Sequence, residues 1–404
     1  MYARRTHGPL PLGGLMIFAA VLSAWLQYAA DGKPQARALV TGACPTVTYA
    51  GGSVPMHQRA GEDLAHGWNE NVCEAAVPAM STNLIVGEKR LPHPVRRITT
   101  LVVTGDTGCR MKGGEQQNCG DPAGWQFPRI ARAIARARPD LIVDIGDYLY
   151  REDNCPPEIK GCVNYWGDTS AAWAADWFEP AAPLFAVAPL AVARGNHEDC
   201  YRAGGGWFRF LEPTEQTACP NPITANDGTP PYPLALDGLR LVIVDSAADA
   251  SDVTVDPQRA AYYQRSFDAA ASLAGSGANR WIVTHRPPYA NGNAASVLHA
   301  KPADATAFDA VITGHVHDFA AVNVTDYPPM IVNGEGGDDL DDIGATAQYV
   351  AANKFAFAKP DPFATKQFGF ALYTRTFNGW TISLRDANGV ERRTCTLTAH
   401  EVSC

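Results

Sequence analysis

Short apolar runs separated by amphipathic stretches dominate the chain from residue 98 onward. Seven runs, bounded by Gly, Asp or Pro, predict strands buried on both faces: Ile98–Val103, Leu141–Ile145, Leu190–Ala193, Leu239–Val244, Trp281–Thr284, Phe308–Ile312 and Met330–Val332. Stretches between them predict helices over Pro128–Arg138, Asp168–Phe178 and Pro257–Leu273. This alternation of strand and helix predicts a layered α/β domain, which we assign to residues 98–345.

The end of the chain has a different pattern. Three further runs, Phe368–Thr376, Trp380–Arg385 and Arg392–Thr398, are separated by Asn378-Gly379 and Asn388-Gly389. Asn-Gly between apolar runs is a strong hairpin signal, because both residues tolerate the positive φ that tight hairpin turns require. We therefore expect residues 346–404 to form antiparallel strands that complete the same domain.

The first hundred residues divide into two parts. Arg4-Arg5 precedes a mostly apolar stretch from Leu10 to Ala30, a pattern typical of a secretory signal and long enough to span a bilayer. We expect residues 1–30 to be a signal peptide or an N-terminal membrane anchor, with possible membrane attachment through residues 10–30. A buried core helix is the less favoured interpretation, because such a helix should be amphipathic. Residues 31–97 show little periodicity and predict an irregular arm or a small β element.

Composition narrows the class of protein. The chain has 404 residues, of which 46% are hydrophobic and 19% charged, as in ordinary globular proteins. The formal net charge is -9, and no dense Lys/Arg run is present in the part expected to fold. A protein that binds duplex nucleic acid normally carries a basic surface, so a nucleic acid duplex is a poor candidate partner.

Ten cysteines follow the apolar stretch in close sequential couples. In an exported chain, such couples predict disulfides, whereas the absence of any C-x-x-C argues against a zinc site. The expected pairs are Cys109 with Cys119, Cys155 with Cys162, Cys200 with Cys219, Cys395 with Cys404 and Cys44 with Cys73. We accordingly expect a periplasmic or secreted protein.

Five short segments with metal-binding side chains each follow an apolar run: Gly105-Asp106-Thr107-Gly108, Gly146-Asp147-Tyr148-Leu149-Tyr150, Gly195-Asn196-His197-Glu198, Thr284-His285 and Gly314-His315-Val316-His317. The carboxyl ends of parallel strands are where α/β sheets bind ligands. Asp, Asn, Tyr and His together suit Fe, Mn or Zn better than Ca. By contrast, the acidic stretch 338–342 lacks the spacing of a calcium loop, and we expect a solvated loop there.

The five segments resemble the metallophosphoesterase superfamily, and within it the purple acid phosphatases. That family's blocks G-D-x-G, G-D-x-x-Y, G-N-H-E/D, V-x-x-H and G-H-x-H occur here in family order, with Ile282 in place of the valine. Most metallophosphoesterases begin with D-x-H, whereas Asp106 is followed by Thr107-Gly108 and Tyr150 supplies the replacement ligand. The resemblance implies a layered αββα sandwich and a binuclear metal centre.

Carried over to this chain, the resemblance implies a role for each site residue. Fe(III) would be held by Asp106, Asp147, Tyr150 and His317. A second ion, Fe(II), Zn(II) or Mn(II), would be held by Asp147, Asn196, His285 and His315. His197 would assist the leaving group, with Glu198 as its orienting partner. By their positions beside the ligands, Arg194, Arg286 and Tyr289 are candidates for substrate binding.

The function expected from these features is hydrolysis of phosphate monoesters of small molecules, by attack of a metal-bound hydroxide. Two alternatives remain open: a metal-dependent phosphodiesterase or nucleotidase of the same superfamily, and a non-catalytic exported metal- or phosphate-binding protein. His197 argues against the last, because a binding protein needs no proton donor. The chain contains neither G-x-x-x-x-G-K-[ST] nor G-x-S-x-G, which disfavours P-loop and serine-hydrolase chemistry.

Overall fold

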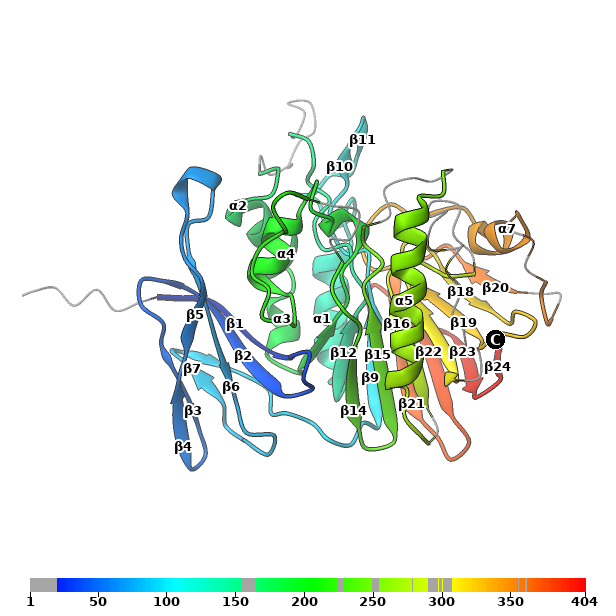
Figure 1. Ribbon diagram of the computed structural model, residues 1–404, viewed down its shortest axis with the longest axis horizontal. Coiled ribbons are helices and arrows are strands. Elements are labelled where there is room, and N and C mark those ends of the chain that lie inside the picture. The colour runs from blue at the N-terminus through cyan, green and yellow to red at the C-terminus, as the bar shows by residue number, and fades with distance from the viewer. Residues whose placement is uncertain are drawn as a thin grey trace, which may run out of the picture.

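The computed structural model describes residues 20–154, 165–223, 228–248, 254–277, 279–289, 297, 300, 307–352, 354, 356–359 and 362–404. Two large β-sheets lie face to face at its centre (Figure 1). In the described chain, the larger sheet has eleven strands in the order β24 (Glu401–Ser403), β23 (Glu391–Thr398), β22 (Trp380–Asp386), β21 (Gly369–Arg375), β9 (Thr100–Thr104), β12 (Leu141–Asp144), β13 (Leu190–Val192), β1 (Ala20–Tyr28), β2 (Pro34–Thr41), β6 (Asn71–Ala76) and β5 (His57–Ala60).

The smaller sheet has seven strands over the same described residues. Their order is β14 (Tyr232–Leu236), β15 (Leu239–Val244), β16 (Arg280–Thr284), β17 (Ala310–Thr313), β19 (Met330–Asn333), β18 (Phe319–Val322) and β20 (Phe363–Thr365). The strands β9, β12 and β13 run parallel in one sheet, and β15, β16, β17 and β19 run parallel in the other. Each of the seven strand predictions made from apolar runs is therefore confirmed, apart from small differences at the ends.

Helices cover the outer face of each sheet. Against the larger sheet lie α1 (Phe127–Ala137), α2 (Ser170–Trp173), the π-helix η2 (Ala174–Phe178), α3 (Ala182–Phe185) and α4 (Gly204–Phe210); against the smaller lie α5 (Pro257–Leu273) and α7 (Ala345–Ala352). Along β9, Val102 packs toward the helices whereas Leu101 and Val103 pack toward the second sheet. This alternation is the two-residue period of a strand, and it explains why the runs are apolar on both faces. The predicted αββα sandwich is confirmed.

The predicted C-terminal strands are also confirmed. Antiparallel β21, β22 and β23 extend the larger sheet from β9, with Asn378-Gly379 and Asn388-Gly389 at the two turns. The Thr376 N–H donates to the Gly379 carbonyl across the first turn. The chain end thus completes the sheet that carries part of the site.

The prediction of an apolar leader over residues 10–30 is wrong for Ala20–Tyr28. These residues form β1, which pairs with β13 on one side and β2 on the other, and its last six residues are buried. A strand buried on both faces is as apolar as a signal segment, so hydropathy alone does not distinguish them. Residues 1–19 of the predicted leader lie outside the described residues. Among the described helices, none has the length and apolar character that crossing a membrane requires.

Residues 31–97 are mainly β structure, the second of the two forms expected for them. Besides β2, β5 and β6, they contain a short helix η1 (Leu64–His66) and a separate sheet in the order β4 (Gly52–Pro55), β3 (Thr46–Tyr49), β7 (Ile85–Val86) and β8 (Lys89–Arg90). Val47 and Val86 of this small sheet pack with Leu26 and Ala38 of the large one. The segment is therefore integrated with the sandwich rather than an irregular arm.

Four of the five predicted disulfides are confirmed: Cys44–Cys73, Cys109–Cys119, Cys200–Cys219 and Cys395–Cys404. The fifth predicted pair, Cys155–Cys162, lies outside the described residues. The Cys109–Cys119 bridge encloses the hairpin of β10 (Met111–Lys112) and β11 (Glu115–Gln116), which projects at the upper edge of Figure 1.

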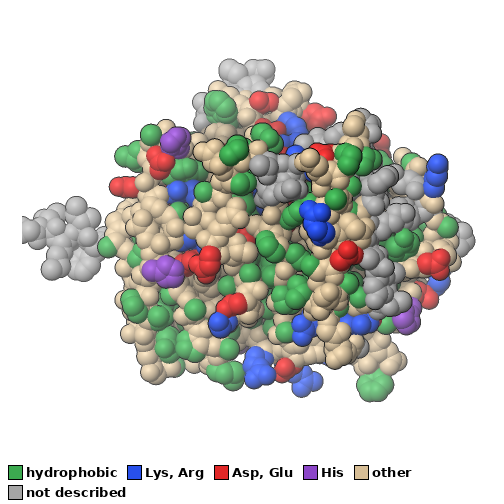
Figure 2. Space-filling view, in the orientation of Figure 1, with side chains coloured by type: hydrophobic (Ala, Val, Ile, Leu, Met, Phe, Trp, Pro, Cys, Tyr) green, Lys and Arg blue, Asp and Glu red, His purple; other side chains and the backbone are tan. Residues whose placement is uncertain are grey.

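On the face shown in Figure 2, basic and acidic side chains are interspersed rather than gathered in one basic patch.

Candidate active site

The five predicted segments lie at the carboxyl ends of parallel strands. Asp106 follows β9, Asp147 follows β12, Asn196 follows β13 within the short helix η3 (Asn196–Glu198), and His285 and His315 follow β16 and β17. Because the two sheets pack face to face, these ends meet along one edge of the sandwich.

The backbone at this edge is strained at several ligand positions. Three predicted ligands have left-handed backbone conformations, with φ of 55° at Asp106, 61° at Asp147 and 70° at His315. Such conformations are costly for residues other than glycine and persist where surrounding structure enforces them. Gly195 is required for a different reason, since a Cβ there would lie 2.1 Å from Asp147 Oδ1. The loops are thus shaped to bring these side chains together.

Seven predicted ligands converge on one point. Asp106, Asp147 and His317 form one group, and Asp147, His285 and His315 form a second, with the ligand atoms of each group within 4.8 Å of one another. Asp147 belongs to both. Tyr150 Oη lies 2.7 Å from Asp147 Oδ2 and 3.0 Å from His317 Nε2, while Asn196 Oδ1 lies 3.0 Å from His285 Nε2. Two groups sharing one carboxylate indicate a dinuclear metal site.

The electrostatics of these side chains fit bound cations. Burial raises the pKa of Asp106, and burial together with the carboxylates of Asp147 and Asp106 raises the pKa of Tyr150 well above its usual range. Burial opposes ionisation of Asp147 as well, but His285 and His197 outweigh it and hold its pKa well below normal. A cation in the centre would stabilise each anionic oxygen directly. Oxygen and imidazole donors of this kind fit Fe, Zn or Mn.

Hydrogen bonds from the outer ring nitrogens fix two of the histidines. His285 Nδ1 lies 2.9 Å from the Ile145 carbonyl, and Nε2 faces Asp147 at 3.2 Å. His317 Nδ1 lies 2.8 Å from the Asp339 carbonyl, and Nε2 faces Asp106 at 3.4 Å. Donation from Nδ1 to a carbonyl leaves the Nε2 lone pair directed inward, as ligating histidines require.

Comparison with known proteins identifies the family. The model of the calcineurin-like phosphoesterases matches residues 99–319, more than half of the chain. The chain belongs to this family. It is accordingly a metal-dependent phosphoester hydrolase.

Solved structures show the same fold at low sequence identity. The purple acid phosphatase PPD1 from yellow lupin seeds is 13% identical, with a TM-score of 0.56 over 93% of this chain and 73% of the lupin chain. PhoD is 11% identical, with a TM-score of 0.59 over 94% of this chain and 91% of PhoD. A sequence comparison with curated proteins finds no significant match.

His197 lies beside the two groups of predicted metal ligands. Its backbone N–H donates to Asp147 Oδ1 at 2.9 Å, its ring Nε2 is 4.0 Å from Asp147 Oδ2, and its ring centroid is 3.8 Å from that of Tyr150. Burial lowers the pKa of His197 to about 4, although Asp147 and Glu152 act in the opposite direction. The protonated form of the ring, which could donate a proton, is therefore populated mainly in acidic solution.

The prediction that Glu198 orients His197 is wrong. The buried Glu198 carboxylate accepts hydrogen bonds from the N–H groups of Asp147, Tyr148, Leu149 and Gly195 at 2.8–3.2 Å. It holds two site loops in place instead. The carboxylate facing His197 Nδ1, at 2.7 Å, belongs to Glu152. Only its position two residues after Tyr150 could have drawn attention to it.

Two of the three predicted substrate contacts are also wrong. Arg194 is buried, donates to the Glu198 carbonyl and pairs with Asp245 at 3.2 Å. Tyr289 is fully buried in the core beneath α5, with its ring 4.7 Å from that of Tyr327. Both residues are close in sequence to a predicted ligand, but their side chains point into the protein and away from the site. Arg286 does line the cavity, with Nη1 3.5 Å from His315 Nε2.

A cavity of about 520 Å³ opens over the cluster. Besides site residues, its lining includes Arg110, Lys112, Glu115, Arg202, Val316, Asp339, Leu340, Asp341 and Tyr349. Sequence reasoning missed three of its cationic side chains, Arg110, Lys112 and Arg202, because neither residue type nor spacing distinguishes them from surface residues.

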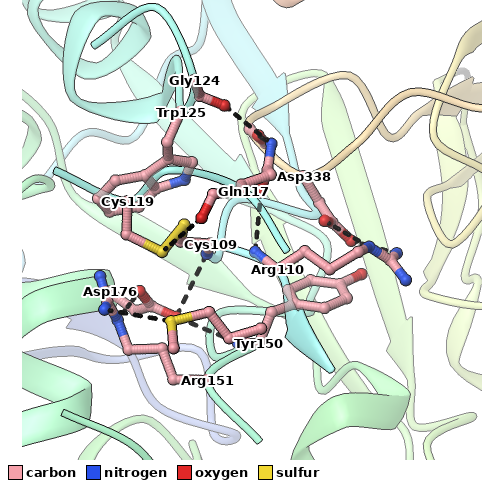
Figure 3. Close-up of a disulfide and its surroundings, with 12 residues drawn as sticks. Cys109, Arg110, Gln117, Cys119, Gly124, Trp125, Tyr150, Arg151, Asp176 and Asp338 are labelled. Carbon is pink, nitrogen blue, oxygen red and sulfur yellow. Dashed lines mark hydrogen bonds and ion pairs between the residues drawn. A yellow bond between two sulfur atoms is a disulfide. The ribbon is translucent and has the colours of Figure 1, made fainter. Parts of the chain in front are cut away.

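Arg110 shows how the cavity wall is built. Its guanidinium donates to Asp338 at 2.9 and 2.5 Å and lies 5.3 Å from the Tyr150 ring centre, beside the Cys109–Cys119 disulfide (Figure 3). Asp338 is fully buried, so the prediction of a solvated loop fails at this position. The one sequence feature that sets Arg110 apart is its position directly after Cys109, a cysteine predicted to form a disulfide.

Proposed function

We propose that this protein is an exported phosphatase that hydrolyses phosphate monoesters of small molecules at a centre of Fe(III) with Fe(II), Zn(II) or Mn(II). The observation that carries the proposal is the phenol of Tyr150 inside the ligand cluster. Its oxygen contacts both Asp147 and His317, where a further histidine would otherwise be expected. Phenolate is a hard donor and favours a ferric ion.

The residues around the cluster suit a doubly charged phosphate group. When bound, two ions would neutralise charge on phosphate oxygens and acidify a water molecule. Arg286 stands beside His315 and is positioned to hold a phosphate oxygen. His197 lies at the edge of the cluster, where it can give a proton to the leaving oxygen.

Four disulfides support export, because such bonds persist in oxidising compartments. Cell fractionation tests the proposed export: the protein should be found in the periplasm or the medium. Its cysteines should react with an alkylating reagent only after the disulfides have been reduced. Recovery in reduced form from the cytoplasm would contradict it.

The experiment that tests the metal assignment combines metal analysis, a visible spectrum and a substrate panel on purified protein. We expect two metal ions per chain, a violet Fe(III)–tyrosinate band, and loss of that band in Tyr150→Phe. The matched control is Tyr148→Phe, since Tyr148 packs away from the cluster among Trp173 and Trp177. A colourless zinc- or manganese-only enzyme would overturn the ferric assignment.

The same panel tests the bond that is cleaved. An aryl phosphate monoester should be hydrolysed faster than the corresponding diester. A preference for the diester would favour the phosphodiesterase alternative. Tight phosphate binding without any turnover would favour a binding protein.

A further inference from the structure

The cavity over the cluster is larger than one phosphate group requires. At about 520 Å³ it falls in the range of sites that enclose a whole small molecule. The part of a substrate beyond its phosphate must therefore also lie against this wall. If His197 protonates the leaving oxygen, the alcohol part of the substrate faces the side of the cavity where His197 stands.

That side carries two cationic side chains around one carboxylate. Lys112 Nζ lies 3.8 Å from Glu152 Oε2, and Arg202 Nη1 lies 3.6 Å from Glu152 Oε1. Arg202 Nε is also 3.7 Å from Asp199 Oδ2. None of these contacts is within hydrogen-bond distance.

Arg202 has a donor that the described residues do not satisfy. Its Nη1 is buried and has no hydrogen-bond partner among them, and a buried donor without a partner is costly. Arg110 differs, because each of its guanidinium nitrogens has a hydrogen-bond partner: Asp338 for Nε and Nη2, and Glu115 at 3.0 Å for Nη1. A ligand that accepts hydrogen bonds would therefore satisfy Arg202, whereas Arg110 is already bonded within the protein.

Both cations are carried by anchored backbone. Lys112 lies inside the loop closed by Cys109–Cys119, and Arg202 lies inside the loop closed by Cys200–Cys219, two residues after Cys200. The two side chains are about one third exposed, at 37% and 30%, and both line the cavity. They are thus held in place yet accessible from the cavity.

We propose that Lys112 and Arg202 form a subsite for a second anionic group, a phosphate or carboxylate, on the alcohol part of the substrate. This inference rests on the proposed phosphomonoesterase function. It names the substrate class as small phosphate monoesters that carry a second negative charge a few bonds from the leaving oxygen.

Three substrates with similar primary leaving groups test the subsite. Glycerol 3-phosphate has no second anion, 3-phosphoglycerate has a carboxylate, and 1,3-propanediol bisphosphate has a phosphate. We expect kcat/KM to be about tenfold or more higher for the doubly anionic compounds, since charge-assisted hydrogen bonds contribute on that scale. The ratio between the last two distinguishes a carboxylate from a phosphate subsite.

Substitutions then test whether Lys112 and Arg202 cause the preference for doubly anionic substrates. Lys112→Gln and Arg202→Gln should each lower it several-fold, and the double variant should reduce it to about threefold or less. Lys112→Arg should retain it, and Lys33→Gln, an exposed lysine paired with Asp31, is the matched control. Equal kcat/KM for all three substrates, or a preference unchanged in the double variant, would overturn the subsite.

A binding measurement keeps this test separate from the proposed function. Calorimetry with the non-hydrolysable propane-1,3-bisphosphonate and propylphosphonate should show tighter binding of the former, lost in the double variant. If no ester is hydrolysed but this difference is found, the phosphatase proposal fails while the subsite stands. If the esters are hydrolysed and the two phosphonates bind equally, the subsite is wrong.

Discussion

The two ends of the same parallel strands hold aspartates in opposite environments. At the amino ends, Asp140 accepts the N–H groups of Thr99 and Thr100 at 2.8 and 2.9 Å. The Asp309 carboxylate likewise accepts hydrogen bonds from the backbone N–H and the guanidinium of Arg280. At the carboxyl ends, Asp106 and Asp147 are buried near each other on left-handed backbone.

The pKa values of Asp140 and Asp106 follow the same division, whereas His285 and His197 hold the pKa of Asp147 well below normal despite its burial. The N–H groups and hydroxyls of Thr99 and Thr100 outweigh partial burial and hold the pKa of Asp140 below its usual range, whereas burial raises the pKa of Asp106. The amino ends are therefore built for stability, and the carboxyl ends accept a cost in stability in return for a cation-binding cluster.

The largest expected effect comes from Asp106→Asn. Asn has the same shape and tolerates the left-handed backbone at this position. We expect phosphoester hydrolysis to fall about a thousandfold, since metal contacts contribute several kcal/mol to transition-state stabilisation. Because ionised Asp106 is disfavoured by burial, the metal-free variant should unfold at the same temperature as the metal-free parent or higher. A large drop in that temperature would show that the comparison between the two ends is wrong.

Glu152→Gln is expected to have a smaller effect, through His197. Glu152 raises the pKa of His197, so its removal should shift the high-pH limb of the kcat profile, where the proton donor is lost, to lower pH and decrease kcat at a fixed pH on that limb about tenfold. Metal content should not change. Glu179→Gln, on the surface beyond η2, serves as the control. A uniform loss at all pH values would indicate a structural role only.

The smallest effect is predicted for Asp140→Ala. We expect a loss of about 1 kcal/mol in the free energy of unfolding at pH 7 and unchanged hydrolysis. The pKa of Asp140 is lower in the folded state, so its contribution is present above the usual Asp pKa of about 4 and disappears as the pH falls below it. Chemical denaturation at pH 7 and at low pH measures both. A difference that persists at low pH would exclude the carboxylate as its source.

Much of the site could be predicted because each ligand lies directly after a strand. An apolar run is followed by a ligating residue, with a glycine between them before Asp106 and Asp147 but not before His285, so local pattern alone places these three residues at one edge of the sandwich. Their convergence follows from strand direction, which the alternating pattern also predicts.

What could not be predicted is the direction of side chains next to these ligands. Arg194 and Arg286 both adjoin a ligand-bearing segment, yet one pairs inside the protein with Asp245 and the other reaches the cavity. The partner of His197 was misassigned for the same reason. Strand β1 was missed because apolarity reports burial and does not say whether the surroundings are lipid or protein.

The position of β1 has a consequence for how the chain acquires its structure. Gln27 of β1 is paired with Leu190 of β13, so β1 is synthesised well before the strand with which it pairs. Pairings between such distant segments slow folding, and the unpaired edge is prone to wrong association in the interval. Assembly of the larger sheet thus depends on late arrival of β13, and shortening the chain into β1 should separate β2, β6 and β5 from the remaining strands.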